Sequence, residues 1–300
     1  MNPSDYNQIE GTYPVQPANY PAFAGNEGVA LVLQSDLPAF KKGDLVLPTR
    51  AALGTWRDFA WLGEQECFTL ESLKSIPVEL AACLTVNPPT AFRLVHDWAL
   101  GAECIVQNAA TSTVGQCIIQ ILKALNSHTK TVNIIRNDPL VSKVKAQKDH
   151  LMQLGATHVF TESEMQEESQ FIRSLKPTVA FNAVGGALAG QMANLLADNA
   201  SVVTYGAMSR RAMQIPAACQ IFHNVQFRGF WMTRWYREHS MQERKQMVEC
   251  IVQIMKEQKL KLSIVSVPLA EDSMQRVEHI QNQRCSALRE KILLVNKAHE

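Results

Sequence analysis

Short apolar segments alternate with amphipathic ones from about Pro88 to residue 230, and this alternation limits the possible folds more than any other feature. It opens with the helical segment "PTAFRLVHDWAL". The segments that follow are "ECIVQN", "VGQCIIQILKAL", "TVNIIR", "VSKVKAQKDHLMQLG", "HVFTE", "TVAFNAVGG", "LAGQMANLLA" and "SVVTYG". Because strand–helix alternation requires right-handed crossovers, we predict an α/β fold with a parallel, doubly wound sheet.

The segments on either side of this region differ from it in composition and in the secondary structure that they predict. Residues 1 to about 85 are rich in Pro and Gly, and "GVALVLQ" and "GDLVLP" predict small twisted strands rather than helices. After "VQFRGFWMTRW" come a long amphipathic helix "MQERKQMVECIVQIMKEQK", a strand-like "LSIVSVPL", a further helix and a final "KILLV". These last segments are too few for a domain, so we expect them to pack on the first. The predicted division is 1–88, 89–230 and 231–300.

Composition excludes several classes of protein. A hydrophobic content of 46% over 300 residues indicates a globular chain with room for two domains. Apolar runs all fall short of the roughly 18 residues that span a bilayer, and a net charge of +1 gives no reason to expect nucleic acid as a partner. The cysteines are scattered without CxxC spacing, which favours a reducing compartment and buried thiols over disulfides or metal ligands. They are Cys67, Cys83, Cys104, Cys117, Cys219, Cys250 and Cys285.

The stretch "CIVQNAATSTVGQCIIQ", residues 104–120, is a candidate phosphate-binding loop. It has a single glycine, Gly115, where a following helix must pass close to the strand. Small side chains at Ala109 and Ala110 let a phosphate approach, and the hydroxyls of residues 111–113 can donate hydrogen bonds. Taken alone, the stretch fits an ordinary strand–turn–helix equally well.

The ends of the following strands strengthen the prediction of a dinucleotide site. An acidic residue about 20 residues further on would bind the ribose 2′-hydroxyl of NAD, but in "NIIRND" Arg136 comes first. A guanidinium there pairs with the 2′-phosphate of NADP, although a solvated arginine remains an alternative and Asp138 favours NAD. "FNAVGG" and "VTYGAM" end in small residues at the carboxyl edge of the predicted sheet, where open parallel sheets bind ligands.

The N-terminal region resembles a known superfamily. "GNEGVALV" (Gly25–Val32) followed by "KKGDLVLP" (Lys41–Pro48) is similar to the medium-chain dehydrogenase/reductase superfamily, which combines a chaperonin-10 (GroES)-like β domain with a Rossmann domain. Zinc alcohol dehydrogenases of that superfamily have histidine where this chain has Asn26. Their structural zinc lobe needs four cysteines, and this region supplies two. We therefore expect no metal.

Within the superfamily, the chain resembles the mitochondrial trans-2-enoyl-thioester reductases, also called enoyl-[acyl-carrier-protein] reductases. The motifs that carry this resemblance are "NPSDYNQIEGTYP", "GNEG", "LGTWR", "VNPPTAFRL", "QNAATSTVGQ", "IIRND", "VTYGAM" and "RGFWMTRW". The resemblance implies NADPH-dependent reduction of trans-2-enoyl thioesters in mitochondrial fatty acid synthesis, with hydride added to Cβ and a proton to Cα. It also implies an acyl carrier protein or CoA thioester as partner and a homodimer.

The resemblance assigns roles to particular residues. The proton donor would be Tyr13, in a Gly-x-Tyr segment, because tyrosine stays protonated at neutral pH; the alternative is a loop aromatic beside Pro14. The implied cofactor-binding residues are Asn87, Thr111, Ser112, Thr113, Val114, Arg136, Asn137, Asp138, Tyr205, Gly206, Ala207, Met208, Phe230, Trp231, Met232, Thr233 and Lys291. Their aromatic members fit the core equally well, except that Trp231 best suits a pocket wall. Five arginines either meet a carrier protein or CoA phosphate or are merely solvated: Arg210, Arg211, Arg228, Arg234 and Arg237.

Two departures from the family pattern leave other functions open. Thr113 stands where a glycine or alanine is expected before Val114, which would crowd a pyrophosphate. Family members also have a presequence and further strands before the segment matching Met1, so we expect an incomplete catalytic domain with unpaired sheet edges, and a cytoplasmic location if Met1 is the true start. The alternatives are a zinc-free quinone or enone reductase, and a catalytically silent binding protein.

Overall fold

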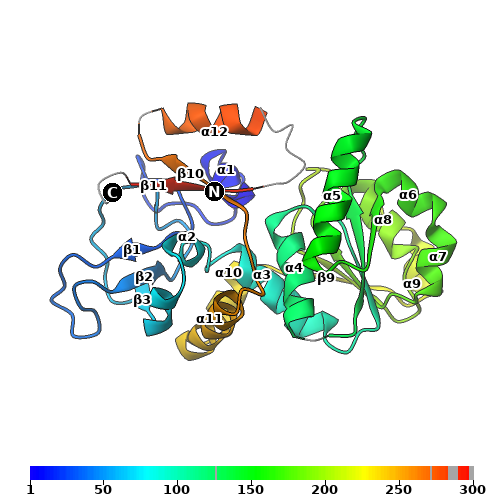
Figure 1. Cartoon of the computed structure of the whole chain (residues 1–300), viewed down its shortest axis with the longest axis horizontal. Helices are drawn as coiled ribbons and strands as arrows, with labels where there is room; N and C mark the ends of the chain where they lie inside the picture. Colours follow the sequence, from blue (N-terminus) through cyan, green and yellow to red (C-terminus); the bar gives the residue numbers. More distant parts are fainter. Residues whose placement is uncertain (126, 271, 283–289, 297–300) are drawn as a thin grey trace. The chain divides into compact units, whose positions relative to one another are not determined.

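The computed structural model describes residues 1–125, 127–270, 272–282 and 290–296, which divide into two compact units (Figure 1). Thr90–Trp231 form the parallel-sheet unit. Met1–Pro89 and the described residues from Met232 onward form the divided unit, so named because its segments come from both ends of the chain.

The parallel-sheet unit is built on six strands that are all parallel, in the order β6-β5-β4-β7-β8-β9. This is the 3-2-1-4-5-6 order of doubly wound dinucleotide-binding folds, and it confirms the predicted fold class. The strands are β4 (Cys104–Gln107), β5 (Lys130–Ile135), β6 (His158–Thr161), β7 (Val179–Asn182), β8 (Ser201–Thr204) and β9 (Gln226–Gly229).

Helices cover both faces of this sheet (Figure 1). They are α4 (Thr113–Ala124), α5 (Val141–Leu154), α6 (Glu162–Glu167), α7 (Ser169–Ser174), α8 (Gly186–Ala193) and α9 (Ala217–Ile221), with a π-helical turn at Val95–Ala99. Ile134 and Ile135 are consecutive in β5 and point to opposite faces. Ile134 packs in the cluster that includes Met192 of α8, whereas Ile135 packs in the cluster that includes Leu151 of α5. Each fully buried side chain of this size contributes about 2 kcal/mol.

The divided unit contains two small sheets. One is antiparallel, in the order β1 (Ala30–Leu31), β2 (Leu45–Pro48) and β3 (Cys67–Thr69); the other is a parallel pair of β10 (Ile264–Pro268) and β11 (Lys291–Val295). The helices are α1 (Pro3–Ile9), η1 (Glu71–Ser75), α2 (Val78–Ala81), α10 (Met232–Glu238), α11 (Met241–Lys256) and α12 (Ser273–Asn282). Helix α3 (Asn87–Leu94) begins in this unit and ends in the other.

Arg244 of α11 connects the C-terminal and N-terminal segments of the divided unit. Its guanidinium donates hydrogen bonds to the carbonyl oxygens of Pro48 and Thr49, both at 2.6 Å, and lies over the Tyr236 ring at 3.9 Å. The side chain is buried, and this burial lowers the pKa of the guanidinium. Residues near 244 thereby contribute to the same unit as residues near 48.

Two expectations from the sequence are wrong. The first was that residues 1–85 hold strands and no helices, yet α1 begins at Pro3, with a capping box between Asn2 and Asp5 that satisfies the first backbone amides. The second was that all cysteines are buried, yet Cys250 is exposed on the solvent face of α11. Cys67, Cys83, Cys104, Cys117 and Cys219 are buried as expected, and Cys285 lies outside the described residues.

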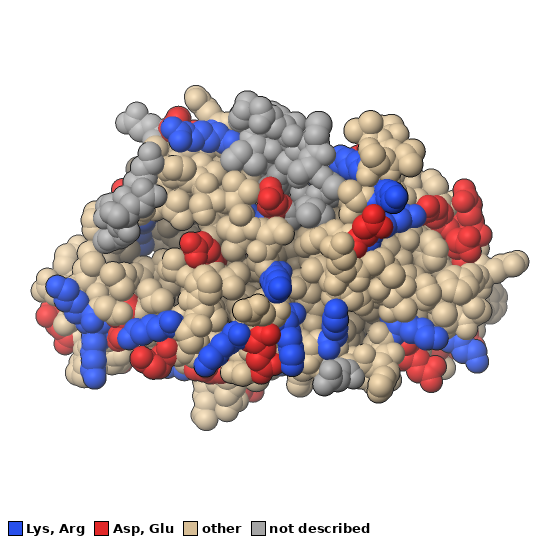
Figure 2. Space-filling view, in the orientation of Figure 1, with Lys and Arg blue, Asp and Glu red and all other residues tan. Residues whose placement is uncertain are grey.

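Charges of both signs are interspersed on the surface (Figure 2). Ion pairs such as Arg50–Glu66 at 2.7 Å and Lys148–Glu164 at 2.6 Å are examples. Within the described ranges, no helix has the combination of length and apolar character needed to span a bilayer.

Candidate active site

The loop between β4 and α4 leaves little room for side chains. An added Cβ at Gly115 would lie 2.7 Å from the carbonyl oxygen of Ala110, so glycine lets α4 begin directly against the loop. Ala109 has a φ of 50°, a left-handed conformation that is costly for a residue with a Cβ. The loop is therefore a tight turn with small side chains, as a phosphate-binding turn requires.

The N-terminus of α4 has free hydrogen-bond donors. Ser112 is its N-cap, and the Ser112 hydroxyl accepts a hydrogen bond from the Gly115 amide at 3.2 Å. The amides of Thr113 and Val114 have no acceptor among the described residues. Two free N–H groups at the positive end of a helix dipole form an anion site, so this end of α4 fits a pyrophosphate.

Tyr205, which follows β8, brings a buried hydroxyl toward the same loop. Its Oη is buried and makes no hydrogen bond of acceptable geometry within the described chain, although the Ser112 hydroxyl lies nearby. Burial raises the pKa of Tyr205, and Ser112 opposes that effect only in part. Because a buried hydroxyl without a partner is costly, this group fits a site in which a ligand provides the partner.

A buried amide network holds the carboxyl edge of the sheet at the point where the strand order reverses. Asn108 Nδ2 donates to Asn182 Oδ1 at 2.8 Å, and Asn108 Oδ1 accepts from the Ala183 amide at 2.7 Å. Asn182 also donates to Thr204 Oγ1 at 3.1 Å. Asn108 and Asn182 were not among the residues predicted from the sequence, although an asparagine at the end of each of two apolar strands was a visible signal.

The loop after β5 contains the predicted adenosine-ribose residues. Arg136 is exposed, and its guanidinium has no acceptor in the described parts of the chain. Asn137 Oδ1 accepts from the Ser163 amide at 3.2 Å. Asp138 forms an ion pair with Lys143; the Lys143 hydrogen bond and the Leu140 amide lower the pKa of the Asp138 carboxyl. Arg136 is thus the side chain of this loop that is open to an anion.

In the divided unit, the backbone on both sides of Tyr13 is held firmly. The carbonyl oxygen of Asn7 accepts hydrogen bonds from the amides of Thr12 at 2.8 Å and Tyr13 at 3.0 Å. The carbonyl oxygen of Tyr13 accepts from Gln16 Nε2 at 2.9 Å. The side chain is half-buried. Tyr13 therefore has a fixed backbone and a phenol ring that is partly accessible.

Lys291, at the start of β11, lies in a buried polar network. Its Nζ donates to Asn2 Oδ1 at 2.5 Å, to Asn87 Oδ1 at 2.8 Å and to Glu27 Oε1. The side chains of Lys291 and Glu27 are only 2% and 4% exposed. All three ammonium protons therefore have acceptors in this unit. Asn87 keeps its Nδ2, which has no acceptor among the described residues, as a donor for a ligand.

Asn26, which stands where the zinc dehydrogenases have histidine, has a structural role. Its Nδ2 donates to Asp5 Oδ1 at 2.7 Å, and its Oδ1 accepts from the Ala52 amide at 2.8 Å. Asp5 is buried, and desolvation raises the pKa of its carboxyl. Among the described residues, no three His, Cys, Asp or Glu side chains are grouped so that they could hold a metal ion.

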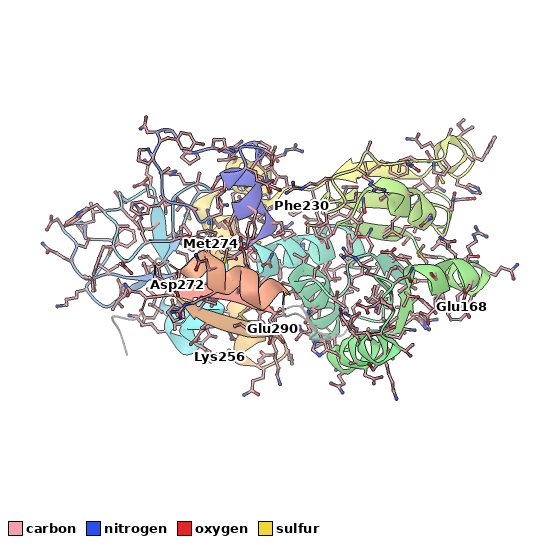
Figure 3. The ribbon with its side chains drawn as sticks, turned by 90° about the horizontal axis from the view of Figure 1, so that it is seen from above. Glu168, Phe230, Lys256, Asp272, Met274 and Glu290 are labelled. Carbon is pink, nitrogen blue, oxygen red and sulfur yellow. The ribbon has the colours of Figure 1, made fainter. Side chains whose placement is uncertain are left out.

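The remaining predicted residues follow β8 and β9. Phe230, labelled in Figure 3, meets the Trp98 ring edge-on, with ring centroids 5.7 Å apart. Gly206 passes close to Ala183, since an added Cβ would lie 3.0 Å from its carbonyl oxygen. Ala207 and Met208 are exposed, Trp231 and Thr233 are half-buried, and Met232 is buried. Met232 and Thr233 belong to the divided unit and the others to the parallel-sheet unit.

Known relatives of the chain are named enoyl-[acyl-carrier-protein] reductase, mitochondrial. The Caenorhabditis elegans protein of that name is 39% identical over 267 residues, 87% of this chain and 74% of its own length. The human protein is 38% identical over 83% of this chain and 66% of its own length. The chain belongs to the enoyl-[acyl-carrier-protein] reductase family. The resemblance seen in the sequence motifs is thereby confirmed, and the chain spans about two thirds to three quarters of these relatives.

Solved structures and a broader family model agree with this membership. The 2-enoyl thioester reductase heterodimer Etr1p/Etr2p of Candida tropicalis has a TM-score of 0.84 at 28% identity, covering 95% of this chain and 86% of that chain. A structure of Etr1p is a complex with NADP and crotonyl-CoA, with a TM-score of 0.85. The zinc-binding dehydrogenase family model matches residues 113–253. The enoyl reductase family is thus part of a superfamily of nicotinamide-dependent enzymes.

Proposed function

We propose that this chain reduces the carbon–carbon double bond of trans-2-enoyl thioesters with NADPH. The observation that carries the proposal is its relationship to enoyl-[acyl-carrier-protein] reductases along 87% of its length. The names of these relatives favour a mitochondrial location and a place in fatty acid synthesis. The NADP and crotonyl-CoA complex of Etr1p supports the same cofactor and thioester class.

The parallel-sheet unit would hold the cofactor. The free amides of Thr113 and Val114 would bind the pyrophosphate, and the buried hydroxyl of Tyr205 would gain a partner. The exposed guanidinium of Arg136 would pair with the 2′-phosphate, which favours NADPH over NADH. When bound, NADPH supplies the hydride that Cβ of the enoyl thioester accepts.

The divided unit would supply the proton and orient the reactants. Tyr13 would donate its phenolic proton to Cα, so that a side chain of this unit supplies the proton. Asn87 donates a hydrogen bond through Nδ2 while Lys291 holds its Oδ1. In this arrangement Lys291 acts through Asn87.

The surface supports two kinds of macromolecular partner. Five exposed arginines suit an acidic carrier protein or the phosphates of CoA: Arg210, Arg211, Arg228, Arg234 and Arg237.

Strand β9 is the last in the strand order, and Ile221 and Phe222 just before it are 70% and 75% exposed. A homodimer would cover these apolar side chains and the edge of the sheet.

The experiment follows NADPH absorbance with crotonyl-CoA and longer trans-2-enoyl-CoAs. We expect turnover by the wild type and a loss of about 100-fold or more in Tyr13→Phe, which lacks the phenolic proton. Tyr20→Phe is the matched control, because Tyr20 is also a loop tyrosine and is 71% exposed. NADPH oxidation by a quinone but not by an enoyl-CoA would instead establish a quinone reductase. Equal, negligible activity in wild type and Tyr13→Phe would establish a silent binding protein.

A further inference from the structure

The loop after β5 contains two side chains that favour opposite cofactors. In a sheet of this strand order, the adenosine ribose binds at the carboxyl end of the second strand of the first βαβ unit, which is β5. A carboxylate there accepts a hydrogen bond from the 2′-hydroxyl of NAD, whereas an arginine pairs with the 2′-phosphate of NADP. This loop has both Arg136 and Asp138. An unpaired carboxylate would repel a 2′-phosphate, so the partner of Asp138 determines which cofactor the loop favours.

Both oxygens of Asp138 are engaged within the loop and the first turn of α5. Oδ1 accepts a hydrogen bond from the Leu140 amide at 3.0 Å, and Oδ2 lies 2.6 Å from Lys143 Nζ. The two side chains are only 21% and 23% exposed. The Lys143 amide donates to the Leu140 carbonyl oxygen at 3.0 Å, so the same turn holds both partners. The carboxylate is thus turned toward α5 and neutralised there.

The neighbouring charges leave Arg136 as the cation of this loop. Asn137 is tied to the start of α6 through the Ser163 amide. Glu164 of α6 is paired with Lys148 at 2.6 Å. Because Lys143 neutralises the negative charge of Asp138, the remaining charge of the loop is the positive charge of Arg136.

We infer that Lys143 determines cofactor specificity by pairing with Asp138, which removes both the NAD-type acceptor and the repulsion of a 2′-phosphate. This inference rests on the proposed use of NADPH and assigns the preference to a residue beyond the ribose-binding segment itself. Lys143 is a positioning and neutralising residue, since it acts through Asp138.

The test measures binding of two cofactor fragments, adenosine 2′,5′-bisphosphate and AMP, by isothermal titration calorimetry. Because these fragments need no enoyl substrate, the readout does not depend on catalysis. In Lys143→Met we expect the bisphosphate to bind about tenfold more weakly, which corresponds to about 1.4 kcal/mol. AMP should bind equally well or more tightly, because the freed carboxylate can accept from the 2′-hydroxyl.

Two further variants make the test specific. Lys145→Met removes the same charge from an exposed position in α5 that forms no ion pair with Asp138, and should leave the ratio of the two affinities close to that of the wild type. Adding Asp138→Asn to Lys143→Met removes the freed carboxylate and should restore bisphosphate binding to within about twofold of the wild type.

The outcomes separate this inference from the proposed function. If Lys143→Met and Lys145→Met weaken bisphosphate binding equally, or if Asp138→Asn restores nothing, Lys143 does not act through Asp138 and the inference is overturned. If the wild type binds AMP as tightly as the bisphosphate, the proposed NADPH preference fails, and the inference fails with it.

Discussion

The two units hold their segments together in different ways. In the parallel-sheet unit, apolar side chains such as Val132, Val106 and Ala180 come from the adjacent strands β5, β4 and β7 and pack against helices. In the divided unit, strands of two to five residues are joined to distant parts of the chain by two buried cations, Lys291 and Arg244. One unit depends mainly on a continuous apolar core, and the other also depends on buried polar contacts between the two ends of the chain.

Large apolar side chains are exposed in both units, so the contrast lies in the interior. In the divided unit, Phe23 is 60% and Trp61 92% exposed, and in the parallel-sheet unit Phe222 is 75% exposed. Helices cover both faces of the parallel sheet (Figure 1). Apolar packing tolerates substitutions that conserve side-chain volume, because each side chain makes many weak contacts. A buried charge depends on the few groups that pair with it, so the two units should respond to substitution very differently.

The largest effect is expected at Lys291. Lys291→Met leaves Glu27 buried without its cation, so the free energy of unfolding should fall by about 3 to 5 kcal/mol. Urea unfolding measures this loss. Lys259→Met is the matched control, since Lys259 is half-exposed and its ion pair contributes little. Adding Glu27→Gln should recover much of the loss; a loss below about 1 kcal/mol would show that the network is not important for stability.

A smaller effect is expected at Gly115 in the parallel-sheet unit. Gly115→Ala brings a methyl group against the Ala110 carbonyl oxygen, so α4 must shift and stability should fall by about 2 kcal/mol. NADP binding, followed by calorimetry, should weaken as well because the amides of Thr113 and Val114 move. Gly229→Ala is the control, because open space surrounds that position. If the two variants had equal stability and equal affinity for NADP, the close approach of α4 to the loop would be contradicted.

Ala109 offers a change in the opposite direction. Ala109→Gly relieves a left-handed backbone conformation and should raise the free energy of unfolding by up to about 1 kcal/mol, reduced by the greater freedom of glycine in the unfolded chain. Thermal unfolding at neutral pH measures the gain. A lower melting temperature would indicate that the Ala109 methyl group makes packing contacts that outweigh the strain.

The smallest effect is a pH dependence at Asp138. Its carboxyl pKa is lowered from 3.8 by Lys143 and by the Leu140 amide. A lowered pKa in the folded state means that the stabilisation is present above the unfolded value and is lost as the pH falls through the folded value. Asp138→Asn should therefore reduce the loss of stability between about pH 5 and about pH 3, measured by urea unfolding. If the free energy of unfolding of Asp138→Asn fell with pH as steeply as that of the wild type, the ionised Asp138 carboxylate would not contribute to stability.

The doubly wound sheet was predictable because its signals lie within a few residues of one another. The apolar run "CIVQN" became β4, and the helical spacing after Ser112 became α4. Helix α1 was missed because the Pro and Gly content of its region outweighed the capping signal in "NPSD". Both outcomes reflect local backbone preferences.

The candidate site was only partly predictable. Family motifs indicated Tyr13, Asn87 and Lys291 separately, but the contact between Lys291 and Asn87 joins residues 204 positions apart. The pairing of Asp138 with Lys143 spans only five positions, yet it depends on the turn that begins α5. Sequence spacing does not show which oxygen a lysine reaches.

The sequence by itself determined the alternating elements, the tight turn before α4 and the presence of an arginine after β5, since each depends on neighbouring residues. The tertiary structure decided which buried groups meet: Lys291 with Glu27, Arg244 with the end of β2, and Asn108 with Asn182. The physical reason is that periodicity and capping depend on residues within one or two turns of the chain. The partners of a buried charge can be distant in sequence, and they come within hydrogen-bond distance only when the chain is folded.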